Sequence, residues 1–430
     1  MFSFPLPFHP GRLLALAVLL AAGEARAQET AAASLSLNEV LARVSERSPT
    51  LAAQSHGERA AEALIEQAGV RPNPTLDIGV ENVLGTGRVQ GVRSSETTVQ
   101  ASQTFERGGK RDKRIALAGR ERDAAVREFA VHRAEILTTA ARAYVAAVAA
   151  QERVLLAAES PRLARETLAV IENHVKVGAV SPVELARARA ALAAAQAELA
   201  RAEAGLASAR GALAATWGGT PNEVPPLAGT LRVPDTLPAQ ESFRSLLTAH
   251  PRLNWQAAVV ASRRASLALE QSQAASDVTA SGGVRFLREG SDAAFVAGVS
   301  VPLPVRNKNQ GNIRATRETL AAAEQTSRAI ESDLRAVFTA AWQDLTAAHA
   351  AAKTLRRDAL PATEEAHQVV RRAYEAGSTP LTDVLDAQRA LLAIRREILS
   401  AEADYAAALV RVEALTQPAF LATTALLSSR

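Results

Sequence analysis

Two long, alanine-rich stretches, residues 110–177 and 312–376, most restrict how this 430-residue chain can fold. Their high content of Ala, Leu, Glu and Arg favours extended helices that pack closely. Because a helix rises 1.5 Å per residue, a continuous helix of about 65 residues would be roughly 100 Å long. No globular domain of this chain length has such a diameter, so the long helices are expected to form a rod or a tube. Pro161 and Pro361 each remove a backbone hydrogen bond within these stretches, and we expect a kink or a break at both.

The layout of the chain occurs twice, at an offset of about 200 residues. RSPTLAAQ (47–54) matches AHPRLNWQ (249–256), and Gly178 matches Gly377. Each half is predicted to hold a helix, two short strands, a long helical stretch, a turn with Gly and Pro, and a helix that runs back. The helices predicted beside the long stretches are 37–69, 182–217, 242–275 and 380–416. The predicted boundaries are 28–217 for the first repeat, 218–240 for a Pro- and Gly-rich equatorial linker, 241–416 for the second repeat and 417–430 for a C-terminal tail.

The N-terminus has the pattern of a secretory signal peptide over residues 1–27. Arg12 precedes the apolar run 13–22, and ARA at 25–27 supplies small residues for a cleavage site. An apolar run of this length is too short to span a bilayer as a helix. The mature chain is therefore expected to leave the cytoplasm. The sequence has no cysteine, which excludes disulfides, thiolate metal ligands and a lipid-modified N-terminal cysteine.

Four short segments alternate apolar and polar side chains with the period of two that is typical of strands. They are residues 75–83, 97–105, 278–287 and 294–302. In the second segment, Thr98, Gln100, Ser102 and Thr104 form an entirely polar face. Strands of this length with one apolar and one polar face suit an outer-membrane β-barrel. A pair of small soluble hairpins capping a helical bundle would show the same pattern.

Four strands cannot close a barrel, because edges exposed to lipid would leave backbone amides unpaired. Several copies of the chain are therefore expected to pool their strands. A trimer would supply twelve strands (three times four), but the pattern alone does not specify the number three.

Other functional classes find little support. The net charge of +4 is spread along the chain without a basic tract, so nucleic acid is not an expected partner. The histidines are dispersed, and no metal site or cofactor is predicted. GGKRDKR (108–114) lacks the context of a phosphate-binding loop; its Lys110, Arg111 and Arg114 are expected at the junction of strands and helix, as lumen-facing or interface charge. No catalytic set of side chains stands out, so the chain is not expected to be an enzyme.

Three motifs resemble the TolC-type outer-membrane efflux proteins. YEAGSTPLTDVLDAQRAL (374–391) is similar to that family's periplasmic helical turn. SQTFERGGKRDKRIALA (102–118) and VPLPVRNKNQGNIRAT (301–316) are similar to the strand-to-helix junctions of its heavy-metal branch, the CzcC-like cobalt–zinc–cadmium channels. The resemblance implies a mainly α fold with a small β part: a TolC-like α-helical barrel of long antiparallel helices, plus four β-strands per chain that contribute to a trimeric 12-stranded outer-membrane β-barrel.

The resemblance also implies a location and partners. A homotrimer would sit in the lipid of the cell outer membrane and extend into the periplasm. It would dock to a periplasmic adaptor (membrane fusion) protein, which is tied to an inner-membrane pump of the resistance-nodulation-division (RND) type. The channel itself would perform no chemistry, because the pump supplies the energy.

Carried over by position, the resemblance assigns roles to residues at the two turns. Glu184, Asp383 and Asp386 would form an acidic ring at the channel aperture, and Tyr374 would be a constriction residue. Acids in a first helical turn are also ordinary, since they interact favourably with the helix dipole, and a Tyr at helical spacing is often simple packing. Thr379 stands where related channels carry an Arg that helps to lock the closed aperture, so the lock in this chain is open to question.

The turns themselves are the predicted docking points for the adaptor. They contain Gly178 and Pro182 in the first repeat and Gly377 and Pro380 in the second. Gly permits the reversal, and Pro favours a new helix start; plain reversals would need the same residues.

The function predicted is a passive exit duct of a tripartite efflux system, with divalent heavy-metal cations as the expected substrates. A TolC-type channel for drug efflux or type I secretion is an alternative with the same fold. A periplasmic coiled-coil adaptor or structural protein is an alternative of another class, although such a protein would not need strands with a polar face.

Overall fold

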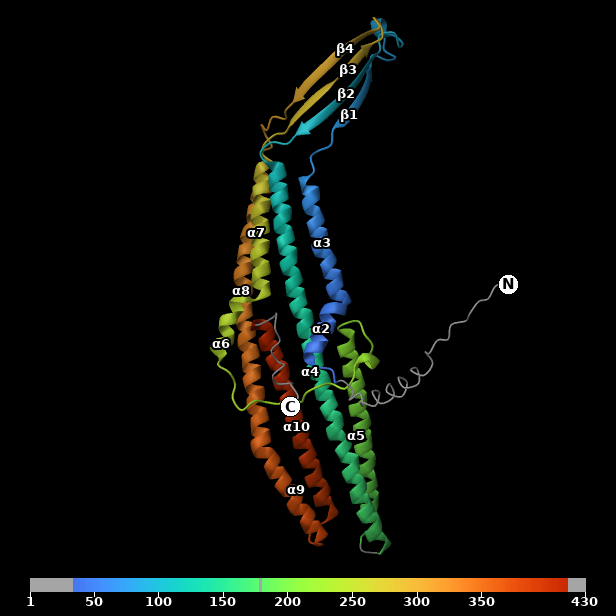
Figure 1. Ribbon diagram of the computed structural model, residues 1–430, viewed down its shortest axis with the longest axis vertical. Helices are drawn as coiled ribbons and strands as arrows, with labels where there is room; N and C mark the ends of the chain where they lie inside the picture. Colours follow the sequence, from blue (N-terminus) through green and yellow to red (C-terminus); the bar gives the residue numbers. More distant parts are fainter. Residues whose placement is uncertain (1–33, 178–179, 417–430) are drawn as a thin grey trace, which may run out of the picture.

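The computed structural model describes residues 34–177 and 180–416 as a long helical rod with a four-stranded sheet at one end and two helical hairpins at the other (Figure 1). The predicted signal peptide, the C-terminal tail and Gly178 lie outside the described residues. None of the described helices combines the length and the apolar character that a membrane crossing requires.

The longest helix is α4, Lys110–Lys176, with 67 residues, which corresponds to roughly 100 Å. It continues through Pro161, so no break occurs there. Pro161 is buried, and packing against neighbouring helices offsets the lost hydrogen bond.

At Pro361 the predicted interruption does occur. Helix α8, Gln310–Thr354, passes into a π-helical turn, Leu355–Ala359, and α9, Leu360–Glu375, then begins with Pro361 in its first turn, where a missing N–H is tolerated.

The helix predicted over 37–69 is instead two helices, α2 (Leu37–Arg47) and α3 (Pro49–Gly69). Ser48 between them has extended backbone angles, as expected for a residue that precedes proline. The helix predicted over 242–275 is divided in the same way, because Pro251 starts a new helix. Its parts are α6 (Gln240–Arg244), a 3₁₀ turn (Ser245–Ala249) and α7 (Pro251–Ser272).

Two helices run back along the rod and complete the hairpins: α5 (Pro182–Ala215) beside α4, and α10 (Leu381–Thr416) beside α8 and α9. Helices α4 and α10 also contact each other and join the two halves. The linker between the halves holds only a short 3₁₀ turn, Pro221–Glu223.

The largest buried cluster lies where the linker wraps the middle of the rod. Tyr144 of α4 is fully buried there among side chains of α2, α5, α10 and the linker. Its hydroxyl lies 2.6 Å from the carbonyl oxygen of Ala228 and 3.0 Å from that of Leu35, and burial raises the pKa of Tyr144 to about 12. The linker is therefore anchored to the rod by both packing and hydrogen bonds.

The sheet has the order β1-β2-β3-β4, and all neighbours are antiparallel. The strands are β1 (Thr75–Glu81), β2 (Glu96–Phe105), β3 (Val278–Leu287) and β4 (Asp292–Ser300). Pairing of β2 with β3 joins the two halves of the chain. Within the described chain, β1 and β4 each pair along one edge only.

The register places apolar side chains on one face of the sheet. Val99 lies opposite Ile78 on one side and Val284 on the other, and Val284 lies opposite Phe295. This apolar face is exposed in the single chain: Phe295 is 93% exposed and Ile78 is 66% exposed.

The other face is polar and carries a charged cluster. Arg285 Nη1 lies 3.0 Å from Glu96 Oε2, Nη2 lies 3.7 Å from Glu81 Oε2, and Nε donates to Thr98 Oγ1 at 3.1 Å. The predicted polar face, including Gln100 and Ser102, is continuous with this cluster. The sheet thus has one face suited to lipid and one suited to water.

Candidate functional site

The two hairpin tips hold the residues assigned to the aperture and to docking. Helix α5 begins at Pro182, and Ser181 caps it by accepting a hydrogen bond from the Val183 amide at 3.2 Å. Gly377 has φ of +73°, a left-handed conformation that favours glycine. Helix α10 begins directly after Pro380, and Asp383 lies in its first turn.

A small apolar cluster packs the two tips against each other. Ile171 of α4, Ala188 of α5 and Leu381 of α10 are almost completely buried in it. Val384, Leu385 and the partly buried Tyr374 complete the contact. Because the cluster contains side chains from both hairpins, any separation of the tips must expose it.

The two aspartates lie on the exposed side of α10. Asp383 and Asp386 are exposed, while Val384 and Leu385 between them are buried. Asp386 forms an ion pair with Arg389, with 2.9 Å between Oδ1 and Nη1. No basic side chain pairs with Asp383 among the described residues.

Glu184 occupies a different environment. It is half-buried and lies near Tyr374, whose pKa is raised by burial and by the charge of Glu184. In the described part of the chain, no hydrogen bond joins Glu184 to Asp383 or Asp386. A single chain therefore places Glu184 against the hairpin contact and the aspartates on an open face.

Two hydroxyl groups at the second tip, those of Tyr374 and Thr379, are buried and have no hydrogen-bond partner among the described residues. Within the same residues, the Thr379 side chain makes no polar contact that could act as the lock that the sequence leaves open to question. An orphan buried hydroxyl contributes no favourable hydrogen bond to the fold.

Tyr374→Phe is therefore expected to leave thermal stability and conductance close to wild type. Tyr374→Ala is expected to lower the free energy of unfolding by about 1–3 kcal/mol, because it opens a void in a half-buried cluster. Thermal unfolding of the detergent-purified protein checks both. A large loss in the Phe variant would show that the hydroxyl has a partner in the assembled channel.

Sequence reasoning missed a tie between the hairpins, which is formed by Arg395 of α10. Its Nη1 lies 2.9 Å from Glu159 Oε2 of α4, and its Nη2 lies 3.2 Å from Glu364 Oε1 of α9. Higher on α10, the buried Glu402 pairs with Arg356 of the π-helical turn. Burial raises the pKa of Glu402 although Arg356 opposes the shift. These contacts hold α10 to α4 and to the α8–α9 arm.

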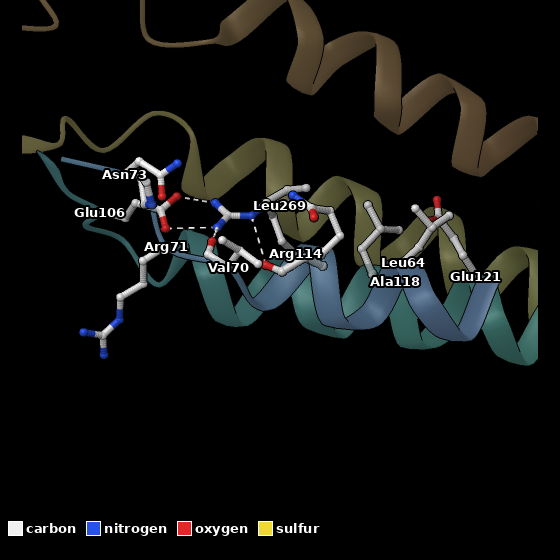
Figure 2. A pocket seen from close by; sticks show the side chains of 13 residues that line it. Leu64, Val70, Arg71, Asn73, Glu106, Arg114, Ala118, Glu121 and Leu269 are labelled. Atoms are coloured by element: carbon white, nitrogen blue, oxygen red, sulfur yellow. Dashed lines mark hydrogen bonds and ion pairs between the residues drawn. The ribbon is translucent and has the colours of Figure 1, made fainter. Parts of the chain in front are cut away.

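At the other end of the rod, basic side chains lock the junction of strands and helices. Lys110 is 7% exposed, and its Nζ lies 2.8 Å from Asp277 Oδ1. Arg114 forms a two-pronged ion pair with Glu106 and also donates to the carbonyl of Val70 at 3.2 Å. Figure 2 shows the contacts of Arg114 with Glu106 and Val70, beside a groove with a volume of about 660 Å³. Arg111 donates to the Gly69 carbonyl at 2.7 Å. Lys110 lies at the junction as expected, but its burial within its own chain excludes the lumen-facing alternative for this residue.

No group of three or more His, Asp or Glu side chains in the described ranges is arranged to hold a metal ion.

Comparison with known proteins decides the family. Residues 40–219 and 243–416 match the family of outer membrane efflux proteins. The chain belongs to this family. Its members are channels and not enzymes, which agrees with the absence of a predicted catalytic set.

Several relatives of the family resemble the chain over most of its length. The cobalt-zinc-cadmium resistance protein CzcC of Cupriavidus metallidurans is 33% identical over 85% of this chain and 86% of its own length. The nickel-cobalt-cadmium resistance protein NccC of Alcaligenes xylosoxydans xylosoxydans is 29% identical over 71% of this chain and 68% of its own.

Solved structures show the same fold. CusC superposes with a TM-score of 0.72 at 16% identity, over 88% of this chain and 91% of that chain. The outer membrane protein VceC from Vibrio cholerae superposes with a TM-score of 0.71 at 19% identity, over 88% of this chain and 96% of that chain. The predicted fold class, long helices with four antiparallel strands in a TolC-like arrangement, is confirmed.

Proposed function

We propose that this efflux protein is the outer-membrane channel of a tripartite system and serves as a passive exit duct for divalent heavy-metal cations. The observation that carries the proposal is the sheet with one exposed apolar face at the end of a helical rod of roughly 100 Å. An apolar face of this extent is unfavourable in water and suits lipid. A rod of this length suits a tunnel across the periplasm.

Assembly into a homotrimer would pair the two free edges of the sheet. Backbone groups left unpaired in lipid cost several kcal/mol each. If β4 of one copy pairs with β1 of the next, both edges disappear. Channels of this family generally function as trimers, which supports a barrel of twelve strands (three times four) rather than another number.

The substrate class rests on the named relatives and on the aperture. Two relatives with matches over two thirds of the chain are resistance proteins for cobalt, zinc, cadmium or nickel. Exposed carboxylates at a narrow mouth attract cations, and Asp383 and Asp386 lie at the hairpin tips where the tunnel would narrow. Glu184 would contribute to the same aperture from the neighbouring hairpin.

The partners proposed are a periplasmic adaptor and an inner-membrane RND pump. The hairpin turns with Pro182, Gly377 and Pro380 are exposed at the end of the rod opposite the sheet, where a periplasmic protein would meet them. Gly178, which the sequence assigns to the same docking turn, lies outside the described residues. Cysteine pairs that crosslink these turns to the adaptor would support docking; crosslinks confined to the linker 218–240 would contradict it.

Deletion of the gene is the test of the substrate class. The deletion strain is expected to lose tolerance to zinc, cobalt and cadmium by several-fold, and plasmid-borne wild-type protein should restore it. Nickel, copper and a panel of drugs are measured in the same experiment. Sensitivity to drugs alone would support an exit duct whose substrates are drugs and not metal cations.

Membrane fractionation tests the duct itself. A detergent-extracted trimer from the outer membrane is expected, with pore activity in planar bilayers. A water-soluble monomer without pore activity would contradict the proposal and favour the adaptor or structural alternative.

A further inference from the structure

The connections between the sheet and the helices, together with the first turn of α4, carry five exposed basic side chains, which we call the basic belt. It consists of Arg71, Arg107, Lys113, Arg306 and Lys308. Each lies within eight residues of the end of a strand, and Figure 1 places these connections at one level of the molecule.

The basic belt differs from the internal basic side chains of the same junction. Lys110 and Arg114 are occupied by Asp277 and Glu106. No ion pair or hydrogen bond is formed by any belt side chain within the described residues. Figure 2 shows the contrast: the guanidinium of Arg114 lies beside Glu106 and Val70, while that of Arg71, at the rim of the groove, extends away from the other labelled side chains.

Carboxylates that could neutralise the belt are scarce. The connecting segments 70–74, 106–113, 273–277 and 301–309 contain only Glu106, Asp112 and Asp277. Two of these are already paired, which leaves Asp112 against five cations. A second copy of the chain would present the same segments, so its junction offers too few acids to pair with the belt.

The belt also adjoins the apolar face of the sheet. Beyond the end of β4, the apolar alternation continues through Leu303, 79% exposed, and Val305, 77% exposed. Arg306 and Lys308 follow at once. On β2, the exposed Phe105 is followed by Arg107 in the same way. An apolar surface that ends in a ring of cations matches the change from hydrocarbon to phosphate at a membrane surface.

We propose that the basic belt binds the phosphate headgroups of glycerophospholipids in the periplasmic leaflet of the outer membrane. The inference rests on the proposed function, which puts the sheet in that membrane. The headgroups supply the anions that the chain itself lacks, and they set the depth at which the sheet stops and the helical rod begins. The belt prefers anionic over zwitterionic lipid, because a headgroup without its own ammonium leaves its phosphate charge free.

The test compares lipid binding by three forms of the full-length protein. They are the wild type, a belt variant (Arg107→Gln, Arg306→Gln, Lys308→Gln) and a control variant (Arg165→Gln, Arg187→Gln, Arg328→Gln). The control removes the same number of exposed, unpaired basic side chains from α4, α5 and α8, away from the junction. Each protein is titrated with phosphatidylglycerol and with phosphatidylcholine, and bound lipid is counted by native mass spectrometry.

The wild type and the control are expected to prefer phosphatidylglycerol. In the belt variant, the ratio of phosphatidylglycerol binding to phosphatidylcholine binding is expected to fall about tenfold. High salt should reduce the preference of the wild type. Trimer content and planar-bilayer conductance are measured on the same samples to show that the belt variant is folded.

Two results would overturn the inference while leaving the proposed function intact. One is an unchanged lipid preference in a belt variant that forms pores. The other is loss of the trimer in detergent without added lipid, which would assign the belt to contacts between copies. A wild type that forms no pore in either lipid would overturn the proposed function and this inference together.

Discussion

Replacing Asp383 and Asp386 together by alanine is expected to weaken block of the channel by multivalent cations by at least about tenfold and to raise its conductance. The ion pair of Asp386 determines the sign of the charge that each form of the channel carries at this surface. Asp386 is paired with Arg389 and Asp383 is not, so these three side chains carry a net charge of −1 per chain (two acids, one base). In the double variant the same surface carries +1, because Arg389 loses its partner.

The measurement is single-channel recording with increasing divalent and trivalent cation on the periplasmic side. Adding Arg389→Ala to the double variant gives a neutral surface and should lie between the two charged forms in anion preference. Glu46→Ala with Glu203→Ala is a matched control, since both acids are exposed and distant from the tips. Block that is the same in the double variant and the wild type would remove the aspartates from the aperture.

The parts of the fold that follow from local periodicity could be predicted from the sequence. The alternation in 97–105 and 278–287 determines which face of each strand is polar, and the register confirms that these faces coincide. The length of the Ala-rich stretches requires a rod, and α4 is one. The single helix predicted over 37–69 is wrong at Ser48, because Pro49 starts a new helix there.

Other features depend on packing that no single segment contains. Pro161 and Pro361 stand at corresponding places in the two repeats, yet only the second lies beside an interruption. Pro161 is buried and Pro361 is exposed, so the two prolines have different surroundings. The pair Asp386–Arg389 is an i,i+3 contact that the sequence does contain. The contacts of Arg395 are not of this kind, because they depend on how α10 is rotated about its axis and how far it is shifted along α4 and α9.

Arg395 is the second position where a large effect is expected, because we propose that its ion pairs help to hold the aperture shut in a channel that has Thr379 at the turn. Arg395→Met is expected to raise the open fraction several-fold at neutral pH. The substitution keeps the aliphatic stem but breaks the ion pairs with Glu159 and Glu364. Arg395 is 35% exposed and both acids are 42% exposed, so each pair contributes only about 0.2–1 kcal/mol. A trimer would contain six such pairs (two per chain). The three with Glu159 of α4 join the two hairpins, and the three with Glu364 of α9 lie within the second hairpin. Loss of the three pairs between hairpins is enough to shift a two-state equilibrium several-fold.

Arg396→Met is the matched control, because the neighbouring arginine makes one longer contact, 3.8 Å to Glu198 of α5, and none to α9. Arg395→Lys separates charge from geometry. A Lys side chain carries its donors on a single nitrogen and cannot hold two of them as far apart as Nη1 and Nη2 of Arg395, so the Lys variant should resemble Met more than wild type. Conductance and open time in planar bilayers are the readouts, with thermal unfolding to confirm that the hairpins remain folded.

The position of the tie explains why it can replace a lock at the turn. Arg395 lies 16 residues beyond Thr379 (395 minus 379), or roughly 24 Å along the helix. A contact at that height resists tilting of the whole α9–α10 hairpin, and the apolar cluster around Leu381 and Leu385 closes the tips below it. Breaking the tie leaves that cluster, the longer Arg396–Glu198 contact and the packing of α10 on α4 to oppose separation. If Arg395→Met and Arg396→Met have the same open fraction as wild type, the cluster alone holds the channel shut, and the hairpin tie is a structural contact without a role in gating.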